Sequence, residues 1–190
     1  MRIFLETDRL VLREFTVADA VNMVSLDSDP EVMRYLTKGR PTPPEVIENE
    51  TLPRILRTYE RCDGHGCWAV VEKSSGQFAG WLALAPHPDG GIDQAELGYR
   101  LRRSAWGRGY ATEGSRALVR KAFTEFEVRR VWAQTMAVNV ASRRVLSRVG
   151  LTWVRTFYPV FDDPIDGTDL GDVEYALHKA AWEQRLRDCW

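Results

Sequence analysis

The sequence predicts a single mixed α/β domain over residues 1–190. Three observations support this prediction. A length of 190 residues is ordinary for one domain. No internal repeat, low-complexity segment or domain linker divides the chain. Strand signals are grouped in the first half, and alternating helix and strand signals follow them.

The first elements follow from side-chain alternation and from capping residues. Residues 9–15, RLVLREF, alternate apolar and polar side chains and predict a strand. Thr16 and Asp19 have the spacing of a capping box, which predicts a helix to about Leu26. Pro30 follows an aspartate at the first helical position and predicts a second helix.

The next segment combines a proline-rich loop, a helix and a hairpin. The loop at 37–46 precedes a longer predicted helix that extends to about Arg61. Pro53 predicts a kink in that helix, because proline lacks the backbone N–H of a helix interior. Strands are predicted at 67–73 and 77–84, since a Ser-Ser-Gly turn separates two apolar runs.

The second half changes its periodicity. A turn at 86–91, PHPDGG, leads to a predicted strand at 95–101, AELGYRL. After Gly107 the apolar residues recur at intervals of three and four, which predicts an amphipathic helix to about Phe126. The remaining elements are a strand, a helix capped by Asn139 and Gly150, two strands and a short helical tail, at 129–136, 139–150, 151–161, 173–179 and 180–190.

Composition disfavours several classes of function. The formal net charge is −1 and the pI is about 6.3, so no basic field favours nucleic acid. We find neither a signal peptide nor a run of about 20 apolar residues, and we expect a cytoplasmic protein with no membrane partner. Cys62, Cys67 and Cys189 are expected to be reduced thiols. Cys62, His65 and Cys67 offer three ligands and no second cluster, so no metal site is expected.

The segment 102–114, RRSAWGRGYATEG, carries the strongest signal. It connects a predicted strand to a predicted helix, whose unpaired N-terminal N–H groups attract anions. Gly107 and Gly109 let the backbone approach a diphosphate closely, and three arginines surround them. The segment lacks the lysine of a P-loop, and Thr112 stands where a dinucleotide fingerprint needs a small residue. A phosphate-bearing ligand is favoured over a plain structural turn.

These residues resemble the acetyl-CoA pyrophosphate loop of the GNAT acetyltransferases, and more narrowly of their ribosomal-protein N-terminal (alanine/serine) acetyltransferases. Four other segments resemble that family in the same order, namely TDRLVLREF, AELGYRL, NVASRRVLSRVGL and VEYALHKAAW. The resemblance implies a mostly antiparallel sheet that is splayed between 95–101 and 130–136. It also implies that acetyl-CoA is the cosubstrate and lies in the splay.

The resemblance implies roles for individual residues. The backbone from Arg108 to Thr112 would cap the diphosphate, Asn139 would hydrogen-bond the pantetheine arm, and Ser142 would lie near the sulphur. The implied cofactor-binding residues are Tyr99, Leu101, Arg103, Trp106, Gly107, Arg108, Gly109, Tyr110, Ala111, Thr112, Asn139, Ser142 and Arg143. The sequence departs from the family at Ser104, where Gln or Arg is common, and at Leu146, where the general-acid tyrosine is common.

Acetyl transfer to an amine needs a base, and a departing thiolate benefits from a proton donor. Glu96 is the candidate base, and a surface glutamate is the alternative interpretation. Ser142 is the candidate acid, and a serine bonded to its own helix is the alternative. Tyr99 is a third candidate, which strand alternation could equally place in the core.

The sequence predicts the cofactor, but for the acceptor it leaves more than one class of amine open. Five aspartates between the last two strands, at 162, 163, 166, 169 and 172, form either a solvated loop or one wall of a cleft for a cationic acceptor. The loop at 37–46 would form the other wall. Protein N-termini and small amines such as an antibiotic or metabolite both stay open, as do a monomer and a homodimer. The alternatives are a non-catalytic CoA-binding regulator and a nucleotide-binding oxidoreductase.

Overall fold

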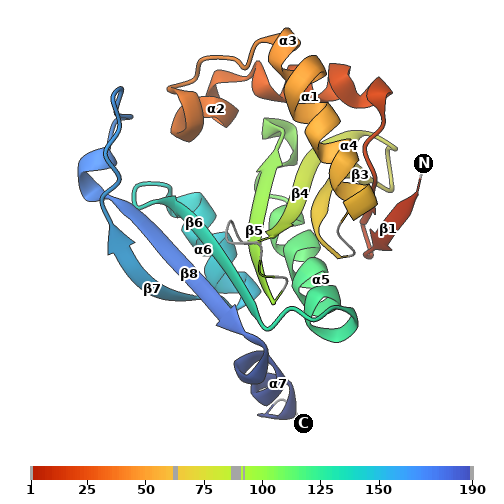
Figure 1. Ribbon diagram of the computed structural model, residues 1–190, viewed down its shortest axis with the longest axis vertical. Helices are drawn as coiled ribbons and strands as arrows, with labels where there is room; N and C mark the ends of the chain where they lie inside the picture. Colours follow the sequence, from red (N-terminus) through yellow and green to blue (C-terminus); the bar gives the residue numbers. More distant parts are fainter. Residues whose placement is uncertain (1, 62–63, 87–90, 92, 189–190) are drawn as a thin grey trace.

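The computed structural model describes residues 2–61, 64–86, 91 and 93–188. Within this part of the chain, one sheet runs in the order β1-β2-β3-β4-β5-β6-β8-β7 (Figure 1). The strands are β1 (Ile3–Glu6), β2 (Leu10–Arg13), β3 (Gly66–Glu72), β4 (Phe78–Pro86), β5 (Gln94–Leu101), β6 (Arg130–Met136), β7 (Thr152–Phe157) and β8 (Asp172–His178). The helices are α1 (Ala20–Asp27), α2 (Pro30–Thr37), α3 (Pro44–Val46), α4 (Leu52–Arg61), α5 (Tyr110–Glu125), α6 (Val140–Val149) and α7 (Lys179–Asp188).

The sheet is splayed between β5 and β6. These parallel strands pair at Gln94–Arg130, Ala95–Val131 and Glu96–Trp132, and the register ends there. On its other edge β5 pairs antiparallel with β4 along its whole length, from Ala95 to Leu101. The two halves of the sheet therefore diverge after Glu96, as the wedge between β5 and β6 shows (Figure 1). The predicted splay is confirmed.

Helices cover both faces of the first half of the sheet. α5 packs on β2, β4 and β5, and its Leu118 and Phe123 are fully buried in the same cluster as Leu82 and Leu84 of β4. α1 packs on β4 and α4 on β3, around a second cluster that includes Phe15. We call these the α5 face and the α1 face. α6 packs on β6 and lies beside α5.

Local signals explain where the early helices begin. The Thr16 N–H donates to Asp19 Oδ2 at 2.9 Å, as the predicted capping box requires. The Glu31 N–H donates to Asp29 Oδ1 at 2.9 Å, and Pro30 occupies the first position of α2. Both predicted helix starts are confirmed, since short-range hydrogen bonds decide them.

The structure differs from the expected elements in three places. β1 was not predicted, because a four-residue strand has too little alternation to be recognised. The helix around Pro53 contains a π-helical stretch, Ile47–Thr51, instead of a simple kink. The strand predicted at 151–161 ends at Phe157, shortly before Pro159.

Some predictions fall outside the described residues. They are Cys62, Cys189 and most of the turn at 86–91. In the part that is described, no cluster of His, Cys, Asp and Glu has the grouping of a metal site. No described helix combines the length and apolar character that a bilayer crossing requires.

Candidate active site

The glycine loop connects β5 to α5 through two left-handed residues. Gly107 has a φ of 71° and Gly109 a φ of 80°, a region that favours glycine. Gly109 is the N-cap of α5, and no side chain caps the helix there. A Cβ atom placed on Gly107 would meet no atom within 4 Å. No side chain therefore caps the N–H groups in the first turn of α5, and the loop before them has free space beside Gly107.

Charged side chains fix the loop from its outer side. Arg108 and the Tyr110 hydroxyl both donate to the Glu72 carboxylate of β3. The bonds from Tyr110 and Arg108 lower the pKa of Glu72 to about 2, so this carboxylate stays ionised. Arg9 donates to the Arg108 carbonyl at 2.9 Å and to Glu113 at 2.6 Å. These contacts occupy the Arg108 side chain and its carbonyl, and they do not involve the backbone N–H groups of the loop.

The other residues predicted in the loop lie close together along it. Trp106 Nε1 donates to the Leu101 carbonyl at 2.8 Å, which closes the turn after β5. Arg103 is exposed, while Ala111 and Thr112 are half-buried in the first turn of α5. The Glu113 carboxylate accepts hydrogen bonds from Thr7 and Arg9, so it holds the first turn of α5 against the segment before β2.

Tyr99 and Ser142 meet on the α5 face beside the splay. The Tyr99 Oη lies 2.9 Å from Ser142 Oγ, and it also donates to the Ser142 carbonyl at 3.1 Å. Asn139 caps α6, with its Oδ1 accepting the Ser142 N–H at 3.1 Å. Three predicted site residues thus form one cluster, although Tyr99 and Ser142 are 43 positions apart in the sequence.

On α6, the side chain of Arg143 makes hydrogen bonds within the protein, and that of Leu146 is buried in the core. Arg143 Nη1 donates to the Ala137 carbonyl at 2.9 Å, and its Nε donates to Tyr175 at 3.3 Å. This guanidinium therefore connects α6 to the end of β6 and to β8. Leu146 is 1% exposed, and its core position supplies no proton donor where the family commonly has a tyrosine.

Glu96 lies on the opposite face of β5 from Tyr99. Successive strand residues alternate faces, and Leu97 and Leu101 pack in the cluster beneath α5. Arg100 confirms the alternation, because its Nη1 bonds Asp27 of α1 at 2.5 Å on the α1 face. Glu96 is also the last residue of β5 in register with β6, where it is paired with Trp132. The candidate base thus lies at the point where the splay opens.

His65 was not predicted as a site residue, and it lines a pocket together with Lys121 and Phe126. It directly precedes β3, two residues before Cys67, which packs in the cluster on the α1 face. Its side chain is 4% exposed, and its Nε2 has no hydrogen-bond partner in the part of the chain that is described.

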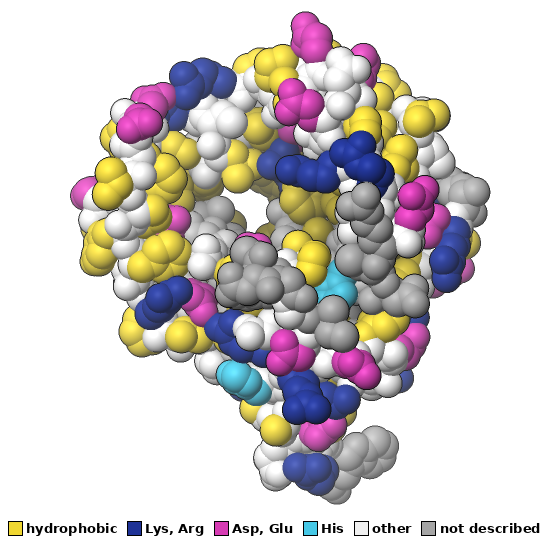
Figure 2. All heavy atoms as spheres, viewed as in Figure 1, with side chains coloured by type: hydrophobic (Ala, Val, Ile, Leu, Met, Phe, Trp, Pro, Cys, Tyr) yellow, Lys and Arg dark blue, Asp and Glu magenta, His cyan; other side chains and the backbone are white. Residues whose placement is uncertain are grey.

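The two walls expected for the acceptor cleft contact each other. Asp163, in the loop between β7 and β8, pairs with Lys38 and, at 2.7 Å, with Arg40 after α2. A cavity of about 300 Å³ lies beside this contact, lined by α2 residues and by Ile165 and Asp166. Figure 2 shows the surface hollowed between the two halves of the molecule. The ion pairs therefore bridge the wide end of the splay.

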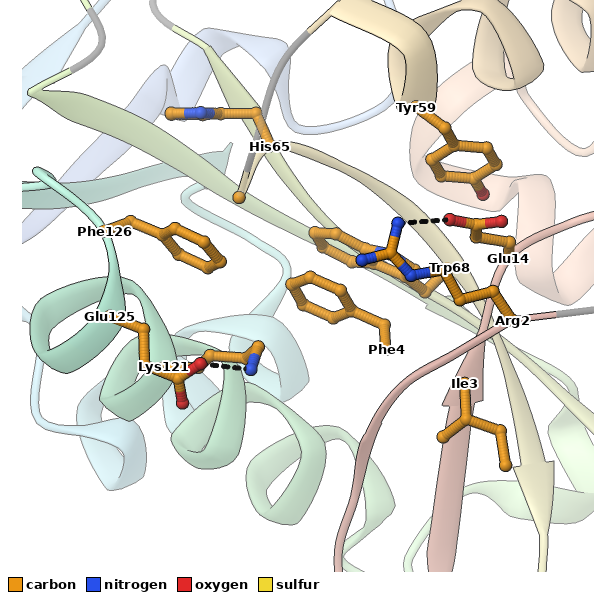
Figure 3. A pocket seen from close by; sticks show the side chains of 11 residues that line it. Arg2, Ile3, Phe4, Glu14, Tyr59, His65, Trp68, Lys121, Glu125 and Phe126 are labelled. Atoms are coloured by element: carbon orange, nitrogen blue, oxygen red, sulfur yellow. Dashed lines mark hydrogen bonds and ion pairs between the residues drawn. The ribbon is translucent and has the colours of Figure 1, made fainter.

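Another pocket, of about 230 Å³, lies between β1, β3 and α5 (Figure 3). Phe4 stacks on Trp68 there with ring centroids 3.9 Å apart, and Lys121 lies over the Phe4 ring. The imidazole of His65 points away from this stacked pair (Figure 3). None of the predicted site residues lines this pocket, so it is separate from the cluster around the splay.

Residues 9–152 match the family model for the acetyltransferase (GNAT) domain, Acetyltransf_3. The chain belongs to the GNAT acetyltransferase family. It is an acetyl-CoA-dependent N-acetyltransferase, and its splayed α/β sheet is the GNAT fold. The oxidoreductase alternative is therefore wrong, in line with the poor fit of Thr112 to a dinucleotide fingerprint.

Individual GNAT proteins resemble the chain to different degrees. It is 38% identical over 177 residues to FsC-acetyl coenzyme A-N(2)-transacetylase of Aspergillus fumigatus, covering 90% of this chain and 71% of the relative. RimL, a ribosomal L7/L12 alpha-N-protein acetyltransferase solved with coenzyme A, superposes with a TM-score of 0.78 at 21% identity, covering 95% and 99% of the two chains. A GNAT acetyltransferase from Bacillus anthracis gives 0.76 at 21% identity, with the same coverage. At this identity the two structures support the fold alone.

Proposed function

We propose that this GNAT enzyme transfers the acetyl group directly to a primary amine while acetyl-CoA and the amine are bound together. The observation that carries the proposal is the end of the β5–β6 register at Glu96. Beyond it, the β5 edge from Leu97 to Leu101 is open to pair with the pantetheine amides, like an added strand. The uncapped N-terminus of α5 at Gly109 suits the diphosphate.

Glu96 serves as the base in this proposal. A lysine-like amine has a pKa of about 10.4, so about one molecule in two thousand is neutral at pH 7, whereas an α-amine has a pKa of about 8. The attacking amine must lose a proton, and the Glu96 carboxylate takes it directly or through water. Its place on the α1 face, opposite Tyr99, supports approach of the acceptor from that side.

Groups on β5 and α6 stabilise the oxyanion and the leaving thiolate. A backbone N–H between Tyr99 and Leu101 stabilises the tetrahedral oxyanion. Ser142 faces the departing sulphur, as its place in the first turn of α6 allows. A thiol resembling free cysteine has a pKa of about 8.5, so its thiolate leaves with modest assistance.

Two acceptor classes belong to the proposal. The 38% identity to the transacetylase named for the N(2) nitrogen of FsC supports a small-molecule amine. A protein N-terminus is the second class, and its link to this chain is the fold shared with RimL. The aspartates of the 158–171 loop favour a cationic acceptor of either class.

A ligand and acceptor screen tests the proposal. Acetyl-CoA and desulpho-CoA should both raise the melting temperature, because a ligand that binds only the folded state stabilises it. CoA release should then accelerate with amines of one class in a panel of α-amines, lysine-like amines and short peptides. Stabilisation by NAD or ATP but not by CoA, or no CoA release with any amine, contradicts the proposal.

A further inference from the structure

The Tyr99 phenol contacts Ser142 at two oxygens, its side-chain hydroxyl and its backbone carbonyl. Tyr99 Oη is the hydrogen-bond partner of Ser142 Oγ at 2.9 Å, and no other partner of that oxygen lies in the described part of the chain. The phenol can also donate to the Ser142 carbonyl at 3.1 Å. One hydroxyl hydrogen of Tyr99 can thus be directed to either oxygen.

The direction of that hydrogen decides where the serine hydrogen points. When Tyr99 donates to the carbonyl, Ser142 can donate back to the phenol. When Tyr99 donates to Ser142 Oγ, the serine hydrogen is released to a third group in the splay. A negative charge near Ser142 favours the second arrangement, because both hydrogens then point along one chain toward it.

We propose that Tyr99 is a positioning residue that turns the Ser142 hydroxyl toward the leaving sulphur. This inference rests on the proposed direct transfer. As the C–S bond of the tetrahedral intermediate breaks, its electron pair goes to sulphur and the amine nitrogen keeps the acetyl group. Glu96 passes the ammonium proton to the solvent before attack and then takes the proton that nitrogen loses as the amide forms, and the thiolate accepts a hydrogen bond from Ser142. Tyr99 keeps its own proton, and the solvent protonates coenzyme A after release.

Burial of the phenol is consistent with that role. It raises the pKa of Tyr99 to about 12, so the hydroxyl is protonated throughout the working range. Complete transfer of this proton to a thiolate would be unfavourable, because the phenol is a weaker acid than a thiol. Donation of a hydrogen bond by Tyr99 leaves its proton in place and therefore avoids this free-energy cost.

A mutant cycle with two donors tests the pair. Tyr99→Phe removes only the hydroxyl and should lower kcat about 10- to 100-fold, the range for a hydrogen bond to a charged group. Acetyl-CoA affinity should change little. Ser142→Ala should lower kcat similarly, and the double variant should be no slower than Ser142→Ala, because the two groups act as one chain.

The leaving group separates this role from a purely structural one. With an acetyl thioester of a strongly acidic aromatic thiol, the thiolate needs less support, and the defect of Tyr99→Phe should shrink. Tyr59→Phe is the matched control, since its buried hydroxyl bonds the Phe15 N–H and the Cys67 carbonyl at the edge of β3. Its kcat should match the wild type.

Several results would overturn the inference. They are an unchanged kcat in Tyr99→Phe, additive losses in the double variant, or an equal defect with both donors. A wild-type enzyme that acetylates an amine retains the proposed function in each of these cases. A wild type that uses no amine contradicts the proposed function itself.

Discussion

At the scale of single residues, Gly107 offers a controlled test of the diphosphate loop. Gly107→Val should weaken acetyl-CoA binding about tenfold or more, because the side chain obstructs hydrogen bonds from the loop backbone to a charged phosphate. Isothermal titration with acetyl-CoA measures the change. Gly76, in the β3–β4 turn, has a φ of 68° against 71° for Gly107, and a Cβ on either glycine meets no atom within 4 Å. Gly76→Val should therefore have a similar backbone strain of about 1–2 kcal/mol with unchanged affinity. Equal affinities in both variants would make the loop a structural turn.

Glu96 is the second residue whose chemistry can be isolated. Glu96→Gln keeps the size of the side chain but cannot take a proton, so the chemical step should slow about 100- to 10,000-fold. The acidic limb of the kcat/KM profile should move toward the pKa of the free amine, while acetyl-CoA affinity stays constant. Glu125→Gln, at the far end of α5, is the control and should match the wild type. A wild-type rate and profile in Glu96→Gln would mean that the amine loses its proton in bulk water.

At the scale of elements, the junction between β2 and α1 should give the protein an acid-sensitive contact. Asp19 is buried, which by itself raises its pKa, but hydrogen bonds from Arg13, Thr16 and Asn22 outweigh burial and lower the pKa to about 2. The folded pKa lies below the unfolded value, so the contribution to stability is complete above about pH 5 and is lost as the pH falls toward 2.

Asp19→Asn should test that contact. It should lower the free energy of unfolding by about 2 kcal/mol at pH 7, and the difference from wild type should narrow between pH 4 and pH 2. Urea unfolding across that range measures it. The exposed pair Lys121–Glu125 provides a comparison, since Glu125→Gln should cost less than about 0.5 kcal/mol at any pH. If the free energy of unfolding of Asp19→Asn differed from that of the wild type by the same amount at every pH, the lost stability would come from packing and not from the charge of Asp19.

At the scale of the whole molecule, ion pairs from Asp163 to Lys38 and Arg40 connect the two halves across the splay. Asp163→Asn should barely change the melting temperature, because these side chains are solvated, but it should raise KM for the acceptor several-fold. The salt dependence of that KM should also weaken. Steady-state kinetics in low and high salt test this. Glu6→Gln is the control, since Glu6, on β1 at the opposite edge of the sheet from β7, forms an equally solvated ion pair with Lys73. An unchanged acceptor KM in Asp163→Asn would show that these ion pairs do not contribute to acceptor binding.

Features that depend on interactions within a few residues were predicted from the sequence, and features that depend on contacts between distant segments were not. The helix starts at Asp19 and Pro30 and the glycines of the loop were predicted, because each depends on hydrogen bonds or φ angles within a few residues. β1 was missed, because its partner strand, and not its own pattern, makes it a strand. The burial of His65 could not be predicted from a loop-like sequence context.

The sequence by itself determined the order of the elements, the glycine loop at the start of α5 and the capping of α6 by Asn139. These features need only local backbone preferences and side-chain periodicity. Only the tertiary structure decided that the β5–β6 register stops at Glu96, and that α5 covers the face of β5 that carries Tyr99. It also brought Tyr99 to Ser142 and Asp163 to Arg40. Those pairs are distant in the chain, and their contact depends on how whole strands and helices pack, which no local pattern specifies.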